Sequence, residues 1–345
     1  MARLAEQFVC VRVQSMNGVN INLFQFEYDL TFMAFFMDSN DRFYARYGGR
    51  DDFDAETCLT KESLVRVMRQ VLELHRAGKV QTGRYEPTGT PARTPEDIPP
   101  MNAVIAKRKE NKCIHCHDVK VTELRHLQSL DKFAREMVFT YPMASAVGLE
   151  MDSREQNRVR AVTPDSPAAR AALRPGDSIV SADGQRVLTQ ADLARVLELT
   201  PKQAKLPLEL RRDGKSAAAT LQLAGDWRRG REPTWRESLH VAGPNAGFWG
   251  EKVKPDERRK LGLAADAMAV KVTFIWGDCA KQAGLKVGDT VVALDGRRDD
   301  WRINQLHGHL NLQRNYGDSV SLVVHRGGKE ETLSMKLPSS PPPLE

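Results

Sequence analysis

The run Cys113-Ile114-His115-Cys116-His117 is the stretch whose residue types and spacing most directly suggest a chemistry. Two thiols separated by two residues can each form a thioether with one vinyl group of a haem. The histidine that follows the second thiol then lies under the iron as its proximal ligand. The pattern therefore predicts covalently attached haem c, bound through Cys113 and Cys116, with His117 on the iron.

Other chemistries fit the same residues. A C-x-x-C pair also suits a reversible disulfide, because the two sulfurs lie within reach of each other. A zinc site needs about four ligands, and His115 and His117 would have to join the two thiolates within five residues. The distal side of a haem stays open: Met143 is the candidate ligand, and five-coordinate iron is the alternative.

Composition limits the class of protein. The chain has 345 residues, enough for two to four domains, and its 41% apolar and 28% charged residues are ordinary for a globular protein. The net charge of +6 is spread along the chain, so we expect no nucleic-acid partner. The densest apolar run, residues 30–37, is too short to span a membrane.

Haem attachment requires export from the cytoplasm, which the first residues do not encode. Residues 1–13 contain no continuous apolar segment and no small-residue cleavage site. Either the signal lies upstream of Met1, or it has been removed, or the motif is not a haem site. We expect a periplasmic or otherwise extracytoplasmic protein.

Residues 1–80 show an α/β pattern. β-branched alternation predicts a strand over 8–13, and apolar runs with a turn between them predict a hairpin over 30–47. Thr60 is placed to cap a helix that stops at Gly78. A Pro-rich linker over 81–100 and a helical segment over 101–142, which carries the C-x-x-C-H run, follow.

The rest of the chain contains an internal duplication. Residues 173–180 match residues 285–292, and Asp183-Gly184 matches Asp295-Gly296, with the same offset of 112 residues. The duplication predicts two modules, over 143–225 and 258–338. A linker or packing segment (226–257) separates them, and a Pro-rich tail (339–345) follows.

Each copy resembles a PDZ domain of the bacterial, circularly permuted kind. The resemblance implies that a peptide adds as a strand to an exposed sheet edge and that backbone N–H groups of a Gly-containing loop bind its carboxylate. By resemblance these loops are Val147-Gly148-Leu149 and Leu261-Gly262-Leu263, and the partners are protein or peptide C-termini. The alternative is that one or both grooves are filled from within the chain.

The order of elements in residues 1–80 resembles the C-terminal half of a thioredoxin fold. The fold class we expect is therefore multidomain: a partial thioredoxin-like α/β domain, a helical C-x-x-C-H segment and two tandem α+β PDZ domains. This arrangement resembles a family of thioredoxin-like and PDZ-containing proteins, some of them selenoproteins, from planctomycete-type bacteria. The family resemblance implies a Cys- or Sec-containing motif upstream of this sequence.

Three functions remain open at this point. The leading interpretation is an exported electron-transfer protein with haem c and two peptide-binding modules, whose redox partner is unknown. The second is a non-enzymatic PDZ scaffold in which Cys113 and Cys116 form a disulfide. The third is a thiol-disulfide oxidoreductase with its active-site motif upstream.

Overall fold

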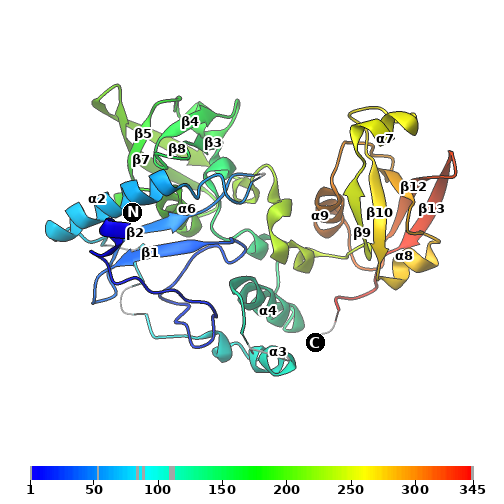
Figure 1. Cartoon of the computed structure of the whole chain (residues 1–345), viewed down its shortest axis with the longest axis horizontal. Helices are drawn as coiled ribbons and strands as arrows, with labels where there is room; N and C mark the ends of the chain where they lie inside the picture. Colours follow the sequence, from blue (N-terminus) through cyan, green and yellow to red (C-terminus); the bar gives the residue numbers. More distant parts are fainter. Residues whose placement is uncertain (1, 53, 83–84, 88–89, 109–112, 343–345) are drawn as a thin grey trace. The chain divides into compact units, whose positions relative to one another are not determined.

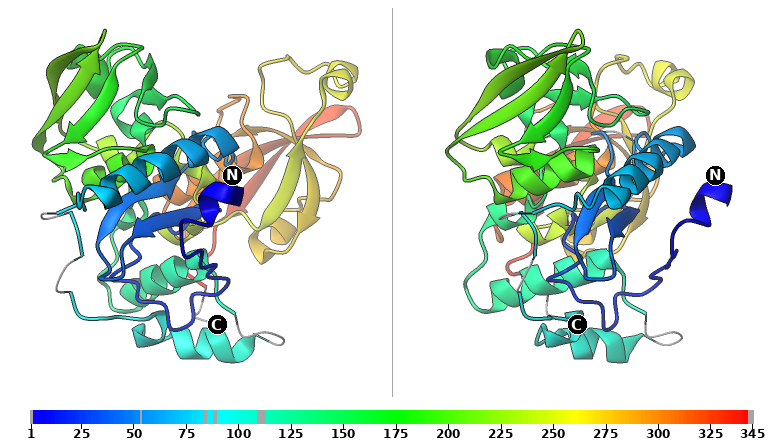
Figure 2. Two further views of the ribbon diagram at one scale, coloured as in Figure 1. Left: turned by 60° about the vertical axis from the view of Figure 1, so that its left-hand side comes forward. Right: turned by 90° about the vertical axis from the view of Figure 1, so that its left-hand side faces the viewer.

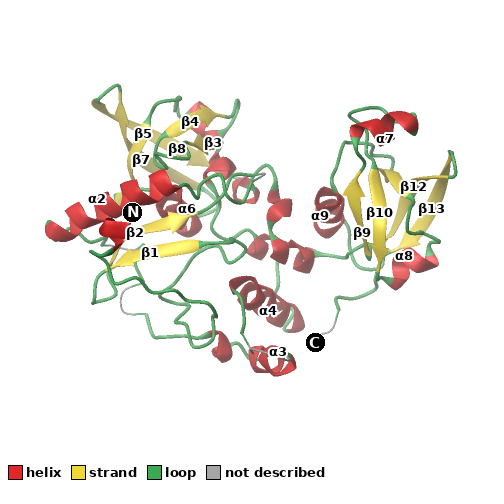
Figure 3. Ribbon diagram, viewed as in Figure 1, coloured by secondary structure: helices red, strands yellow, loops and turns green. Residues whose placement is uncertain are grey.

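The computed structural model describes residues 2–52, 54–82, 85–87, 90–108 and 113–342, and the chain divides into two compact units (Figures 1 and 3). The first unit comprises Met1–His126 and Phe139–Pro233. The second comprises Leu127–Val138 and Thr234–Glu345.

The N-terminal part of the first unit contains a short helix, a strand pair and a long helix. These are α1 (Ala2–Ala5), β1 (Met33–Met37), β2 (Phe43–Gly48) and α2 (Lys61–Arg76), with β1 and β2 antiparallel. The Thr60 hydroxyl accepts the Ser63 N–H at the start of α2, which confirms the predicted cap. The predicted hairpin is also present, although β1 begins three residues later than the apolar run.

The strand predicted over 8–13 is wrong. These residues have no regular secondary structure, and the side chains of Val9 and Val11 are 95% and 81% exposed. Alternating β-branched residues form a strand only where a neighbouring strand pairs with them. The sheet that contains β1 and β2 has these two strands alone among the described residues.

Strand β2 is the centre of this region, and all of its residues are buried. It packs against α2 and against α6 (Gln190–Leu199), and Figure 2 shows α2 lying along the strand pair. The Arg46 guanidinium on β2 is paired with Glu86, and both side chains are about 2% exposed. A buried charge of this kind persists only with such a partner.

The segment with the C-x-x-C-H run is helical, as predicted. It contains η1 (Pro95–Asp97), α3 (Met101–Lys107), α4 (Cys116–Ser129) and η2 (Arg135–Val138). Its buried apolar side chains form a small core with the N-terminal residues Met16 and Ile21. This core fixes the start of α4.

The first module completes the first unit. Its elements are η3 (Ala144–Val147), β3 (Leu149–Met151), β4 (Val159–Val162), α5 (Pro167–Arg170), β5 (Ser178–Ala182), β6 (Gln185–Arg186), α6, β7 (Ala204–Arg212), β8 (Lys215–Leu223) and η4 (Trp227–Arg229). Strands β3 and β4 form one antiparallel pair, and the other strands form a sheet with the order β6-β5-β7-β8. Side chains of both sheets and of α6 share one hydrophobic core.

The second unit contains the second module. Its elements are η5 (Pro233–Trp235), η6 (Glu237–Ala242), β9 (Phe248–Lys252), α7 (Pro255–Lys260), β10 (Val270–Ile275), α8 (Asp278–Gln282), β11 (Thr290–Leu294), α9 (Ile303–Gln313), β12 (Ser319–Arg326) and β13 (Lys329–Lys336). The five strands form one sheet in the order β13-β12-β11-β10-β9. Because β9 is part of this sheet, the module begins before residue 258, within the segment predicted as a linker.

The duplication is visible in matching hydrogen bonds. In the first module Asp177 accepts bonds from the Arg174 N–H and the Arg212 guanidinium. In the second module Asp289 accepts the equivalent bonds from Lys286 and Arg326. The two modules thus use the same buried carboxylate to fix the turn before their central strands.

Candidate functional site

In the first module, the predicted loop Val147-Gly148-Leu149 lies directly before an edge strand. β3 pairs with β4 on one side only, and no other strand among the described residues pairs with its second side. Gly148 has φ +85°, and a Cβ there would lie 2.1 Å from the Ser166 side chain. Only glycine fits this position, where the chain enters β3 against the start of α5.

Helix α6 forms the other wall next to this strand. Leu149 and Met151 of β3 share the hydrophobic core with Leu193 and Leu197 of α6. A loop, an edge strand and a helix beside it are the parts that a PDZ module uses to add a peptide as an extra strand.

In the second module, the same arrangement is built from different residues than those predicted. The edge strand is β9, and Gly247 precedes it with φ +72°. A Cβ at Gly247 would lie 2.5 Å from the Cα of Gly277, the N-cap residue of α8. Gly247 is therefore the counterpart of Gly148.

The predicted loop Leu261-Gly262-Leu263 does not occupy this position. It follows α7, in the connection between β9 and β10, and no atom lies within 4 Å of a Cβ built on Gly262. The shorter connection between β3 and β4 contains no helix among its residues. The inserted helix α7 changes the sequence offset between the two modules for residues that precede β10. The counterpart of Gly148 is therefore Gly247 and not the predicted Gly262.

The side chain of Asn245 joins the loop of the second module to α9. Its Oδ1 accepts the Gly247 N–H at 2.8 Å, and its Nδ2 lies 3.3 Å from Nδ1 of His307. Because an amide Nδ2 only donates, His307 Nδ1 accepts and the proton of the neutral ring is on Nε2. Nε2 is buried, and a hydrogen bond with the Phe248 backbone also acts on the ring.

Aromatic side chains surround His307. The ring centroids of Phe248, Trp249 and Trp276 lie 5.7, 6.3 and 6.3 Å from that of the imidazole. Burial lowers the pKa of His307 to about 4, because an apolar setting disfavours the charged ring. The imidazole is therefore neutral at pH 7.

Exposed aromatic surface lies next to the loop of the second module. Trp249 is 43% exposed, Trp276 is 45% exposed and Phe274 is 60% exposed. The rings of Phe274 and Trp276 stack with their centroids 6.1 Å apart. Sequence analysis did not single out Asn245 or His307. The sequence contained one signal for this loop. Gly247-Phe248 resembles Gly148-Leu149 when the two modules are aligned without the inserted helix α7.

The C-x-x-C-H run lies at the start of α4, whose first residue is Cys116. Burial raises the pKa of Cys116. The Cys116 Sγ lies 3.8 Å from the Leu30 carbonyl oxygen. The His117 ring stacks on His115 with 5.6 Å between centroids, and its Nε2 lies 3.6 Å from Asp118.

This environment contains the ligand types of a haem c site, and one side of it is closely packed. Ile114, between the two cysteines, is 0% exposed and packs in a core with Met16, Ile98 and Met101. The same core contacts Cys116.

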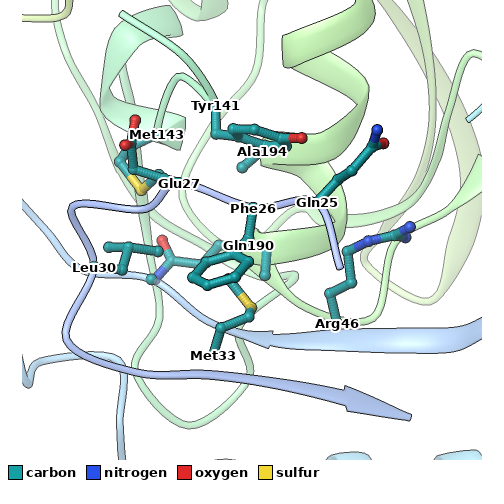
Figure 4. Close-up of a pocket in the computed structure, with 12 residues that line it drawn as sticks. Gln25, Phe26, Glu27, Leu30, Met33, Arg46, Tyr141, Met143, Gln190 and Ala194 are labelled. Carbon is teal, nitrogen blue, oxygen red and sulfur yellow. The ribbon is translucent and has the colours of Figure 1, made fainter. Parts of the chain in front are cut away.

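Met143, the predicted distal ligand, is 6% exposed. It borders a small cavity together with Leu30, Met33 and Tyr141 (Figure 4). The cavity has a volume of about 10 Å³, which is roughly the space of one water molecule. Met143 is buried there as a packing residue.

Two general properties complete the description of the site. Among the residues that the structure describes, no group of three or more His, Cys, Asp or Glu side chains is placed to hold a metal ion. No described helix is long and apolar enough to cross a membrane.

Comparison with known proteins identifies part of the first module. Residues 158–212 match the PDZ domain family. A probable periplasmic serine endoprotease DegP-like from Pseudomonas savastanoi pv. phaseolicola is 28% identical over 188 residues, which cover 52% of this chain and 37% of the relative. A protein of the same description from Chlamydia trachomatis is 28% identical over 178 residues, which cover 51% of this chain and 33% of the relative.

The chain therefore spans about a third of the length of these curated relatives. Among solved structures, the HtrA-type protease AlgW with tripeptide is 21% identical, with a TM-score of 0.27 and coverage of 38% of this chain and 43% of that one. The family match establishes that the first module contains a PDZ domain.

Proposed function

We propose that this chain is an extracytoplasmic peptide-binding protein whose two PDZ modules capture the C-terminal ends of partner proteins. The observation that carries the proposal is the repeated arrangement of a glycine loop, an edge strand and a helix, in a chain whose first copy matches the PDZ family. The named location of the DegP-like relatives supports the extracytoplasmic setting.

In the second module, a peptide would pair with the free edge of β9. Its terminal carboxylate would take the Gly247 N–H that Asn245 Oδ1 now accepts. Backbone N–H groups in such a loop form a concave site for an anion. Exposed Trp249 and Trp276 beside the loop favour peptides with apolar or aromatic side chains near the C-terminus.

Two substitutions at one position test this mode of binding. We would select heptapeptides with free C-termini from a displayed library and measure their affinity by fluorescence anisotropy. Asn245→Asp places a fixed carboxylate at the Gly247 N–H and should weaken binding at least tenfold by repulsion. Asn245→Ala frees the N–H and should leave the affinity within about threefold.

The matched control is each peptide with an amidated C-terminus, which removes the carboxylate and leaves the side chains. Equal binding of acid and amide peptides to the wild type, with no effect of Asn245→Asp, would contradict carboxylate capture by this loop.

Attachment of haem c at Cys113 and Cys116, with His117 on the iron, is kept as a second proposal. Its support is the sequence pattern, in which Cys116 is the first residue of α4 and Cys113 lies three residues before it. A pyridine haemochrome spectrum of the exported protein, made in a host that matures cytochromes c, tests it directly. A c-type spectrum supports attachment, and a protein without haem leaves Cys113 and Cys116 as a dithiol or disulfide.

Peptide capture does not depend on the haem result. The thioredoxin-like resemblance of residues 1–80 likewise remains a prediction. Mass spectrometry of the protein after non-reducing alkylation would show whether Cys113 and Cys116 form a disulfide.

A further inference from the structure

We propose that residues 50–60 act as an internal ligand that closes the peptide-binding edge of the first module, so that the second module is the one open to partners. The proposal rests on the peptide-binding function above and concerns its regulation. The segment connects β2 to α2, and its described residues, 50–52 and 54–60, contact the first module before and after β3.

At the loop end, Asp52 contacts the residues that precede Gly148. The Ser145 hydroxyl, within η3, donates to Asp52 Oδ1 at 2.7 Å. A carboxylate of the chain itself therefore lies next to the loop that, by the proposed function, receives the carboxylate of a peptide.

At the far end of β3, the same segment contacts the turn that leads to β4. The Gln156 amide donates to the Cys58 carbonyl oxygen, and Cys58 is 3% exposed. The Thr60 hydroxyl lies 3.3 Å from the Ser153 carbonyl oxygen, to which it donates. The segment is thus bound before and after β3.

The helix wall is covered as well. The Thr189 hydroxyl donates to the Arg46 carbonyl at 2.5 Å, and the Arg46 N–H donates to Asp192 at 2.8 Å. A Cβ on Gly49 would lie 2.7 Å from the Gln190 amide, so the backbone there lies against the first residue of α6. Figure 4 shows Ala194 of α6 on one side of the small cavity and Met33 and Phe26 on the other.

These contacts leave little space beside α6. The cavity between α6 and the N-terminal residues holds only about 10 Å³. A partner can reach this edge only after residues 50–60 have moved away. In the second module the edge strand β9 begins beside exposed aromatic side chains instead.

Hydrogen-exchange mass spectrometry of the full chain tests the closure without any ligand. The double variant Asp52→Ala/Gln156→Ala removes one side-chain hydrogen bond at each end of β3. We expect amide exchange in residues 50–60 and in β3 to become at least tenfold faster together, with β7 and β8 unchanged. Arg174→Ala, which removes an exposed ion pair with Asp213, is the control and should change neither.

An increase confined to residues 50–60, with β3 unchanged within twofold, would overturn the proposal, because the segment would then not protect the strand. Faster exchange throughout the first unit would show general unfolding. In that case the disulfide variant Asp52→Cys/Ser145→Cys, which links the segment to η3 when oxidised, should slow exchange of β3 at least fivefold relative to its reduced form. Equal exchange rates of β3 in the oxidised and reduced forms would also overturn the proposal.

Site-resolved cross-linking separates this proposal from peptide binding itself. The probe is a pool of heptapeptides with free C-termini and an N-terminal benzophenone. We expect wild-type protein to be labelled in residues 244–338 only, and the Asp52→Ala/Gln156→Ala variant to gain label in residues 143–225. Equal labelling of the first module in both proteins would refute closure. Absence of label in every variant would refute the peptide-binding function and leave the exchange result to decide closure.

Discussion

Burial of His307 makes the stability of the second unit depend on pH. Its pKa is lowered from 6.5 to about 4 by desolvation. Below pH 6.5 the unfolded chain takes up a proton that the folded chain does not, so stability is complete above pH 6.5 and decreases as the pH falls toward 4. A pKa lowered by this amount corresponds to a loss of about 3 kcal/mol in the free energy of unfolding at low pH.

Urea unfolding of the second unit at pH 7 and pH 4.5 measures this loss. His307→Gln should remove most of the difference between the two pH values, whereas His325→Gln on β12 should not. A pH dependence that survives His307→Gln would mean that another group is responsible.

The paired carboxylates Asp177 and Asp289 stabilise the two modules in the same way. Hydrogen bonds from Arg212 lower the pKa of Asp177, whose side chain is 1% exposed. This stabilisation is present above pH 3.8, the ordinary pKa, and is lost as the pH falls through the lower value of the folded state. Asp177→Ala should cost about 2–3 kcal/mol in unfolding free energy, as expected for lost charged hydrogen bonds.

Thermal or chemical unfolding of Asp213→Ala provides the comparison. Asp213 forms an exposed ion pair with Arg174, and its loss should cost less than about 0.5 kcal/mol. Equal effects of Asp177→Ala and Asp213→Ala would contradict a structural role for the buried carboxylate.

At the scale of elements, thiol reactivity distinguishes the environments of the cysteines. Burial raises the pKa of Cys58 to about 11 and also raises the pKa of Cys116 at the start of α4. Iodoacetamide reacts with the thiolate, so at pH 8 we expect exposed Cys10 to react first and Cys58 at least a hundredfold more slowly. Peptide mapping over time gives the order, and rapid labelling of Cys58 would show that residues 50–60 do not stay on the first module.

Local sequence signals correctly predicted elements that are stabilised by residues close together in the chain. Thr60 caps α2 because its own side chain satisfies the Ser63 N–H, and this bond needs no distant partner. The strand predicted over 8–13 was wrong because alternating β-branched residues do not show whether a neighbouring strand is present to pair with them. Gly262 was matched to Gly148 by local sequence similarity, which gives no information about the helix α7 inserted between β9 and β10.

At the scale of the molecule, the segment Leu127–Val138 belongs to the second unit, which its sequence position did not predict. The Arg135 guanidinium donates to the carbonyl oxygens of Ala242, Leu312 and Arg314 at 3.0, 3.1 and 2.5 Å. Arg135→Ala should lower the unfolding free energy of the second unit by about 2–3 kcal/mol. Lys132→Ala in the same segment is the control, and equal effects would show that these bonds do not stabilise the unit.

The duplication was recognised from the sequence because the same Gly-Asp turn occurs in both modules at a fixed spacing. In each module the Asp of this turn is the buried carboxylate, Asp177 or Asp289. The sites around them were only partly predictable. Val147-Gly148-Leu149 is contiguous with its strand, so its position could be inferred from sequence, and its binding of a carboxylate stays a prediction. Asn245 with His307, and Asp52 with Ser145, come together only through folding over long sequence separations, and no local pattern indicates such pairs.

The most direct test of peptide capture is the affinity of the wild-type chain for selected heptapeptides with a free C-terminus, compared with the same peptides carrying a terminal amide. We predict at least tenfold tighter binding of the free acid and loss of that preference in Asn245→Asp. Equal affinity for acid and amide, or a preference unchanged by Asn245→Asp, would contradict the central claim that the loop before β9 receives a C-terminal carboxylate.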